Sequence, residues 1–248
     1  SFYPKVENVK KQVKFELEMG EIERVDFKNQ LFDAYTVDTQ EADLAFHFKG
    51  EKAGFENKII GNFWSLRTYL DSCCQKKPVF ITNGGIFKVN REPLGLYIEN
   101  GKKLFSLNLE KGEGNFFMQP NAVFYINNHQ KTAIVESSAF AHVKDTISYA
   151  LQSGPMLLNK GEINAHFGLN SQNKYIRSGV GVIDETHLVF IISNQPVNLY
   201  DFASLFKEKY NCQNALYLDG AISEMYASKL RRYEYGKDGM DYSVLISV

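Results

Sequence analysis

Two polar residues that follow apolar stretches of the chain are the first candidates for chemistry. Asp219 ends the apolar run in LYLDGAIS, and Asn83 ends the one in VFITNGGIF. Both would lie just past the carboxyl ends of core strands, where open sheets tend to bind ligands. A carboxylate that leaves an apolar strand is partly desolvated, which adjusts its pKa for acid–base catalysis. The alternative for Asp219 is a plain turn cap.

Neighbouring glycines and polar side chains could complete a site around these two residues. Glycine lets the backbone approach a ligand, and free backbone amides can bind a phosphate or sugar oxygen. Arg177 precedes a strongly apolar strand, where it could hold a phosphate through two hydrogen bonds, although a surface salt bridge is the commoner role of a single arginine. Ordinary turns are the alternative for the remaining candidates, which are Gly84, Gly85, Asn115, Asn121, Gln152, Ser153, Gly154, His166, Gly220 and Ser223.

Two helices are expected to lead into the strands that end at Asn83 and Asp219. Residues 62–74 and 198–210 carry apolar side chains at helical spacing, and each segment starts with an asparagine suited to the N-cap. The two helix–strand segments align without a gap. An old duplication would explain this match, but so would the standard length of any helix–strand pair.

The remaining pattern is that of short strands joined by tight turns. Apolar stretches flank turn-forming residues at 99–101, 127–128, 159–161 and 184–186, and further strands are expected at 13–17, 32–37, 44–48 and 242–248. The predicted class is α+β, with a mixed, largely antiparallel sheet core, hairpins and two matching helix–strand units. Residues 1–40 are expected to form a β-rich edge of the domain that residues 41–248 make up.

Composition excludes several functional classes. The chain of 248 residues carries 28 basic and 29 acidic side chains, which argues against nucleic-acid binding through a basic surface. No apolar run is long enough to span a membrane, and the first residues lack the apolar region of a signal peptide, which leaves a removed one open. Aromatic residues are abundant, at 14%. They favour a β-rich fold.

Cysteines and metal-binding patterns contribute little to the functional prediction. With three cysteines (Cys73, Cys74 and Cys212), at least one has no partner within the chain, and we interpret all three as small apolar residues. No metal and no cofactor are predicted. Oxygens of Asp219 and its neighbours could hold a divalent cation, but no dense carboxylate cluster is visible. The motifs of serine esterases, P-loop NTPases and zinc proteases are absent from the sequence.

Seven motifs in order give the chain its family resemblance. They are TNGGIF (82–87), PLGLYIENGK (93–102), GNFFMQPNAVF (114–124), QSGPMLLNKGEI (152–163), NKYIRSGVGV (173–182), VFIISNQPVNLYDFA (189–203) and CQNALYLDGAIS (212–223). Together they resemble the phosphodiester glycosidase family, in particular its bacterial branch. Two departures matter: Ala221 and Ile222 stand where many relatives have glycines, which narrows the loop, and Ile86 replaces a commoner methionine.

The resemblance implies an exo-glycosidase that releases a sugar, N-acetylglucosamine in the known case, from a sugar-1-phosphodiester. Asp219 would be the essential carboxylate, Arg177 the phosphate clamp and Asn83 a hydrogen bonder to sugar or phosphate. The other polar candidates would line the pocket, and Phe87, Phe116 and Tyr175 are candidates for sugar contact. Export from the cell is also implied, because relatives are often exported. Two alternatives stay open, a non-catalytic carbohydrate-binding module and a phosphodiesterase that cleaves P–O. Oligomeric state is not predicted.

Overall fold

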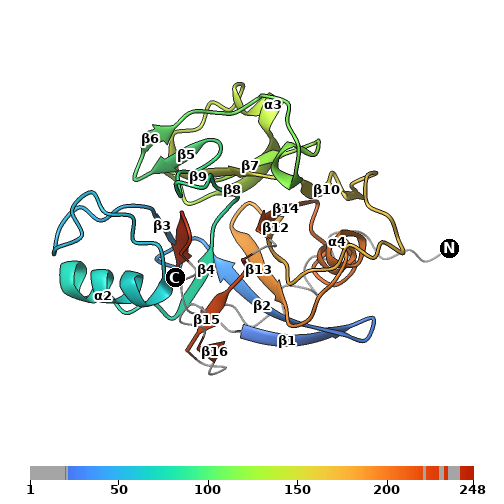
Figure 1. Ribbon diagram of the computed structural model, residues 1–248, viewed down its shortest axis with the longest axis horizontal. Coiled ribbons are helices and arrows are strands. Elements are labelled where there is room, and N and C mark those ends of the chain that lie inside the picture. Colours follow the sequence, from blue (N-terminus) through green and yellow to red (C-terminus); the bar gives the residue numbers. More distant parts are fainter. Residues whose placement is uncertain (1–19, 21, 220–221, 229–231, 234–240) are drawn as a thin grey trace.

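Three antiparallel sheets make up most of the fold. The computed structural model describes residues 20, 22–219, 222–228, 232–233 and 241–248. Within these residues, every pairing between named strands is antiparallel, and few helices accompany the sheets (Figure 1). This architecture confirms the predicted α+β class with a largely antiparallel core.

The largest sheet has seven strands. Their order is β1 (Ile22–Phe27), β2 (Gln30–Asp38), β13 (His187–Ser193), β12 (Ser178–Asp184), β14 (Asn214–Asp219), β10 (Met156–Asn159) and β11 (Glu162–Ile163). β12 and β14 are antiparallel neighbours, and Ser178 pairs with Asp219. The start of β12 therefore lies beside the end of β14, which brings two motif segments together.

Two five-stranded sheets complete the core. One has the order β16 (Arg232–Tyr233), β15 (Met225–Ala227), β4 (Phe80–Asn83), β17 (Leu245–Ser247) and β3 (Ala45–His47). The other has the order β6 (Lys102–Phe105), β5 (Tyr97–Glu99), β9 (Ile147–Ser153), β7 (Ala122–Asn127) and β8 (Thr132–Glu136). The second of these lies above the other two sheets in the view of Figure 1.

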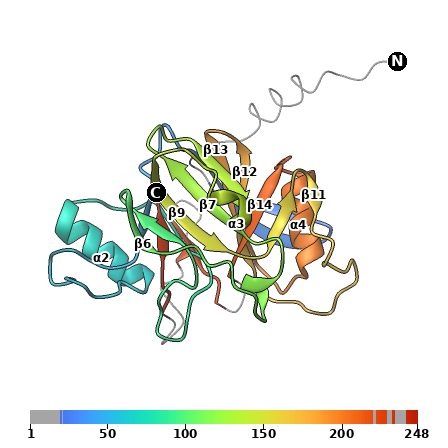
Figure 2. The ribbon, with the colours of Figure 1, turned by 90° about the horizontal axis from the view of Figure 1, so that it is seen from above.

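Two helices lie on opposite sides of the molecule, as both views show (Figures 1 and 2). They are α2 (Phe63–Cys74) and α4 (Leu199–Glu208), and their N-caps are the predicted Asn62 and Asn198. The side-chain oxygen of each asparagine accepts a hydrogen bond from the backbone amide three residues later in the chain. The shorter helical segments are η1 (Asn115–Phe117) and α3 (Ser137–Phe140). Each long helix leads into a core strand, α2 into β4 and α4 into β14, as the alignment of the two segments predicted.

One central hydrophobic core contains side chains from all three sheets. Some strands are buried on both faces, and β14 is an example. On β14, Leu216 and Leu218 face the central core, while Ala215 and Tyr217 face α4. α4 packs so closely that a Cβ on Gly181 would lie 2.6 Å from the Phe206 ring. The helix–strand unit is thereby held in a fixed position, and with it the polar residue that ends β14.

The cysteines differ in part from the sequence interpretation. Cys212 is free and buried under α4, as expected for a small apolar residue, and burial raises the pKa of its thiol. Cys73 and Cys74, however, form a disulfide at the end of α2, so the interpretation as simple small apolar residues is wrong for this pair.

Some expectations lie beyond the described residues. The strand predicted at 13–17 is among them, while the one at 32–37 is part of β2. The division of the chain at residue 40 stays a prediction. Within the described residues, no helix is both long and apolar enough to cross a membrane.

Candidate functional site

Strand ends from all three sheets meet at one polar cluster. β4 contributes Asn83, β9 contributes Ser153, and the β12–β14 pair contributes Ser178 and Asp219. We call these residues, together with Ser223 and Glu224, the strand-end cluster. In an antiparallel pair the carboxyl end of one strand lies beside the start of the next, which is why Ser178, at the start of β12, belongs to a cluster of strand ends.

Ser178 is the link between the two predicted key residues. The Asn83 side-chain amide donates to Ser178 Oγ at 3.0 Å, and Ser178 Oγ in turn lies 3.0 Å from the Asp219 carbonyl oxygen, to which it donates. The Ser223 hydroxyl contacts both Ser178 Oγ and the same carbonyl. The two residues predicted at matching strand ends are thus brought together, although they belong to different sheets.

Ser153 fastens the third sheet to this arrangement. Its hydroxyl donates to the Leu218 carbonyl at 3.0 Å and accepts from the Ile86 amide at 3.3 Å. A Cβ on Gly85 would lie 3.0 Å from Ser153 Cβ, and one on Gly84 would lie 2.9 Å from the Val244 carbonyl. Close packing therefore favours glycine at both positions, against the neighbouring strand segment at Gly84 and against the third sheet at Gly85, a reason that stands beside the predicted ligand approach.

Two buried carboxylates belong to the cluster. Asp219 is 9% exposed and Glu224 is 4% exposed. The Glu224 backbone amide donates to Asn83 Oδ1 at 3.2 Å, so Asn83 bridges Ser178 and the segment after Asp219. Carboxylates removed from water in this way are candidates for acid–base chemistry or for stabilising a cation.

Arg177 is buried beside the cluster, and its guanidinium forms hydrogen bonds with other groups of the protein. Its guanidinium donates to the Val197 carbonyl at 2.7 Å, to the Tyr217 hydroxyl at 2.9 Å, and to the Asn173 carbonyl and side-chain oxygen at 2.9 and 3.1 Å. These four bonds occupy most of its five N–H donors. The clamp role of Arg177 stays a prediction, and the geometry favours a positioning role.

Tyr217 connects Arg177 electrostatically to Asp219. Burial raises the pKa of Tyr217 to about 12, Arg177 opposes this rise, and the Asp219 charge adds to it. The positive charge of Arg177 and the negative charge of Asp219 thus have opposite effects on the pKa of the Tyr217 phenol.

Several predicted pocket residues hold loops in place. Gln152 accepts from the Leu96 and Asn108 amides and donates to the Asn108 carbonyl and to Ser137 Oγ. Asn121 donates to the Phe116 carbonyl at 2.8 Å. Because these side chains are buried with protein partners, their geometry indicates loop positioning, and their predicted contact with a ligand stays a prediction.

The remaining predicted site residues lie in varied settings. Gly154 packs against the Phe116 and Asn115 carbonyls and Asn121, and Asn115 is exposed. His166 is exposed, and its backbone amide and ring both hydrogen-bond the Asn164 side chain. Gly220 lies outside the described residues. Of the aromatic candidates, Phe116 is buried and Phe87 is partly buried, while Tyr175 is 53% exposed and lies against Arg177.

Sequence reasoning missed two members of the cluster, Ser178 and Glu224. Ser178 directly follows Arg177 in the motif NKYIRSGVGV, and Glu224 directly follows the last motif, so position in the motifs could have indicated both. Only the pairing of strands far apart in the sequence brings these two residues next to Asn83 and Asp219. Among the described residues, no group of three His, Cys, Asp or Glu is placed to hold a metal ion.

Comparisons with known proteins identify the family of the chain. A sequence model described as phosphodiester glycosidase matches residues 76–243. The uncharacterized protein YigE of Escherichia coli K12 is 42% identical over 195 residues, which cover 78% of this chain and 73% of YigE.

Two solved structures share the fold at low sequence identity. One is the zebrafish N-acetylglucosamine-1-phosphodiester alpha-N-acetylglucosaminidase catalytic domain, auto-inhibited by its pro-peptide; it has a TM-score of 0.59 and 15% identity, with 92% of this chain and 81% of that chain covered. The other is a hypothetical protein from Synechocystis, with a TM-score of 0.51 and 13% identity, covering 91% and 61%. The family match spans more than half of the chain and includes every residue of the strand-end cluster, and we conclude that this chain belongs to the phosphodiester glycosidase family.

Proposed function

We propose that the chain is an exo-glycosidase that hydrolyses a sugar-1-phosphodiester at the strand-end cluster. The observation that carries this proposal is the convergence of Asn83, Ser178 and Asp219 at the junction of three sheets. Family membership supports the reaction class. The sugar is N-acetylglucosamine or a close analogue, as the name of the zebrafish relative suggests.

The reaction needs few special groups. Phosphate is a good leaving group, so weak acid assistance suffices when the bond between the anomeric carbon and the phosphate oxygen breaks. The electron pair leaves with the phosphate, and positive charge develops at the anomeric carbon. The buried Asp219 carboxylate stabilises this charge, and water supplies the oxygen of the released sugar.

Asn83 and Arg177 have different parts in this proposal. Asn83 fixes Ser178 and the backbone at Glu224, and it presents its polar edge beside the reacting centre. Arg177 positions β14 through Tyr217. The near-neutral charge of the chain agrees with a site that meets one phosphate through local groups rather than through a basic face. Action outside the cytoplasm belongs to this proposal as well.

Hydrolysis of a GlcNAc-1-phosphodiester in ¹⁸O-labelled water tests the reaction. We expect the phosphate product to stay unlabelled, since the C–O bond breaks; label in phosphate would mean P–O cleavage and a phosphodiesterase. Phosphate is the safer product to analyse because the anomeric oxygen of a free sugar exchanges with water.

Asp219→Ala tests the assigned residue. We expect hydrolysis to fall by about 10³-fold or more, while Asp26→Ala, a change at an exposed residue outside the cluster, leaves it unchanged. Unchanged hydrolysis in Asp219→Ala would remove Asp219 from the mechanism. Sugar binding without cleavage of any phosphodiester would favour the carbohydrate-binding alternative.

A further inference from the structure

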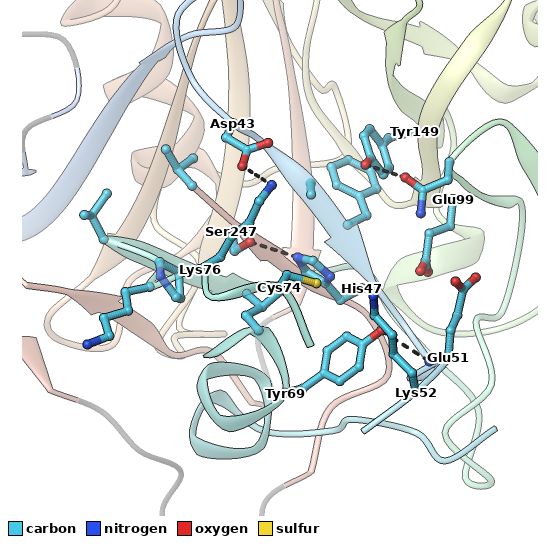
Figure 3. Close-up of a pocket in the computed structure, with 18 residues that line it drawn as sticks. Asp43, His47, Glu51, Lys52, Tyr69, Cys74, Lys76, Glu99, Tyr149 and Ser247 are labelled. Carbon is cyan, nitrogen blue, oxygen red and sulfur yellow. Dashed lines mark hydrogen bonds and ion pairs between the residues drawn. The ribbon is translucent and has the colours of Figure 1, made fainter. Parts of the chain in front are cut away.

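A second polar chamber lies between α2, β3 and the β5–β9 pair, and it shares no residue with the strand-end cluster. Its cavity of about 440 Å³ is lined by Asp43, His47, Glu51, Tyr69, Glu99 and Tyr149, among others (Figure 3). We call it the α2–β3 chamber. Much of its wall comes from residues 43–74, which precede the family match at 76–243.

Two carboxylates mark one side of this chamber. Figure 3 shows the carboxylates of Glu51 and Glu99 close to one another. Glu99 Oε2 accepts from the Tyr97 hydroxyl at 2.5 Å and from the Phe48 amide at 3.1 Å. Within the described part of the chain, neither carboxylate forms an ion pair with a basic side chain. Like charges held together in this way are stabilised by a bound cation.

The two carboxylates also stand at the boundary of a second cavity. That cavity, of about 520 Å³, is lined by Glu51 and Glu99 together with Phe48, Phe105 and others. A ligand held by the carboxylates therefore has room on both sides. Tyr69 and Tyr149 line the first cavity and Phe105 the second, and aromatic faces attract organic cations. The Phe48 ring, which also lines the second cavity, already has the Lys49 ammonium over it.

The opposite side of the chamber offers neutral polar groups. His47 is partly buried, and burial, with the Lys76 charge, lowers its pKa to about 4, so the imidazole is neutral at neutral pH. One ring nitrogen bonds Ser247 Oγ at 2.8 Å, and within the described residues the other has no hydrogen-bond partner. Lys76 is paired with Asp43, while Lys52 and Lys77 are exposed. Hydroxyl groups of a ligand would find partners here.

We propose that the α2–β3 chamber binds a small polyhydroxylated amine, the chemistry of an amino sugar. The ammonium group donates to the Glu51 and Glu99 carboxylates, and the hydroxyls face His47, Ser247 and the Tyr149 hydroxyl, which itself donates to Asn100 at 2.7 Å. A neutral sugar leaves the repulsion of the two carboxylates unrelieved, and an anion adds to it. This site is independent of the proposed hydrolysis at the strand-end cluster.

Calorimetric titration with glucosamine, and with glucose as its neutral counterpart, tests the proposal. The two probes differ at one carbon, which carries an ammonium group in the first and a hydroxyl in the second. We expect glucosamine to bind at least tenfold more tightly, because hydrogen bonds to charged groups are the stronger ones. Equal affinity, or binding of neither sugar, overturns the proposal.

Variants locate the bound amine. Glu51→Gln and Glu99→Gln should each weaken glucosamine binding about tenfold, whereas Glu41→Gln, at an exposed residue outside the chamber, should not change it. Circular dichroism and thermal unfolding check that each variant is folded. Asp219→Asn separates the two sites: glucosamine affinity that survives in Asp219→Asn places the ligand in the chamber, and affinity lost there but kept in Glu99→Gln places it at the strand-end cluster and overturns the proposal.

Discussion

The strand-end cluster and the α2–β3 chamber differ in how far their polar side chains are paired with other groups of the protein. In the cluster, side chains and backbone groups bond one another across three sheets, as the chain from Asn83 through Ser178 to the Asp219 carbonyl illustrates. In the chamber, the facing carboxylates of Glu51 and Glu99 lack basic partners among the described residues. The cluster has a pre-formed geometry, as catalysis requires, while the chamber has two facing carboxylates without ion-pair partners in the described part of the chain, as binding of a cation requires.

The two regions also differ in how the chain builds them. Every cluster residue lies at the end of a strand, or within two residues of one, inside the segment matched to the family. The chamber combines this segment with α2 and β3, which precede it. Changes in the cluster should therefore affect the shared reaction, and changes in the chamber should affect a property particular to this chain and its near relatives.

The largest difference between the two regions is expected in catalysis. Asn83→Ala removes the bonds to Ser178 and to the Glu224 amide, so the reacting groups lose their alignment. We expect kcat/KM on a GlcNAc-1-phosphodiester to fall about 100-fold, while Glu99→Gln changes it less than twofold. Initial rates per folded molecule measure both. Equal losses in the two variants would contradict the separation of cluster and chamber.

The next effect distinguishes positioning from ligand contact near the cluster. Gln152→Ala leaves the Leu96 and Asn108 amides without their buried acceptor, so the free energy of unfolding should fall by about 2–3 kcal/mol. Gln172→Ala, at an exposed glutamine, should change it by less than about 0.5 kcal/mol. Urea denaturation measures both values. A Gln152→Ala variant of normal stability but raised KM would support the original prediction of substrate contact.

A smaller effect concerns the pH dependence of stability in the chamber. Burial and the nearby Glu51 raise the pKa of Glu99 to about 7, so its stabilisation is lost as pH rises from 4.5 to 7. Burial lowers the pKa of His47 to about 4, so its stabilisation is lost as pH falls from 6.5 to 4. Over the shared range the two contributions have opposite slopes and largely cancel.

Single variants should reveal each slope. Relative to the wild type, Glu99→Gln should gain a rise in stability of about 1 kcal/mol per pH unit between pH 5 and 6, and His47→Gln a fall of similar size. Unfolding midpoints in urea at several pH values measure this. Parallel curves for the three proteins would mean that neither group titrates as described.

The smallest effect is expected at His166. This exposed side chain bonds Asn164 and, among the described residues, no member of the strand-end cluster, so His166→Ala should change kcat/KM less than twofold. The pH profile of the reaction should keep its shape in the variant. A loss of tenfold or more would return His166 to the active site and extend the cluster toward the loop that follows β11 (Glu162–Ile163).

Local patterns in the sequence predicted much of the fold. The N-caps Asn62 and Asn198, both long helices and most of the hairpins are confirmed, because short-range hydrogen bonds and apolar spacing decide them. α4 ends two residues before the predicted boundary at 210, since helix ends depend on how the last turn packs.

By itself, the sequence determined the class, the family and the positions of Asn83 and Asp219 at two strand ends. Only the tertiary structure decided that these ends meet through Ser178, that Glu224 joins them, and that Arg177 and Gln152 bond protein groups. The chamber, too, was absent from the sequence interpretation. The physical reason is that strand registry and contacts between sheets join residues far apart in the chain. The pattern of neighbouring residues in the sequence does not determine these long-range contacts.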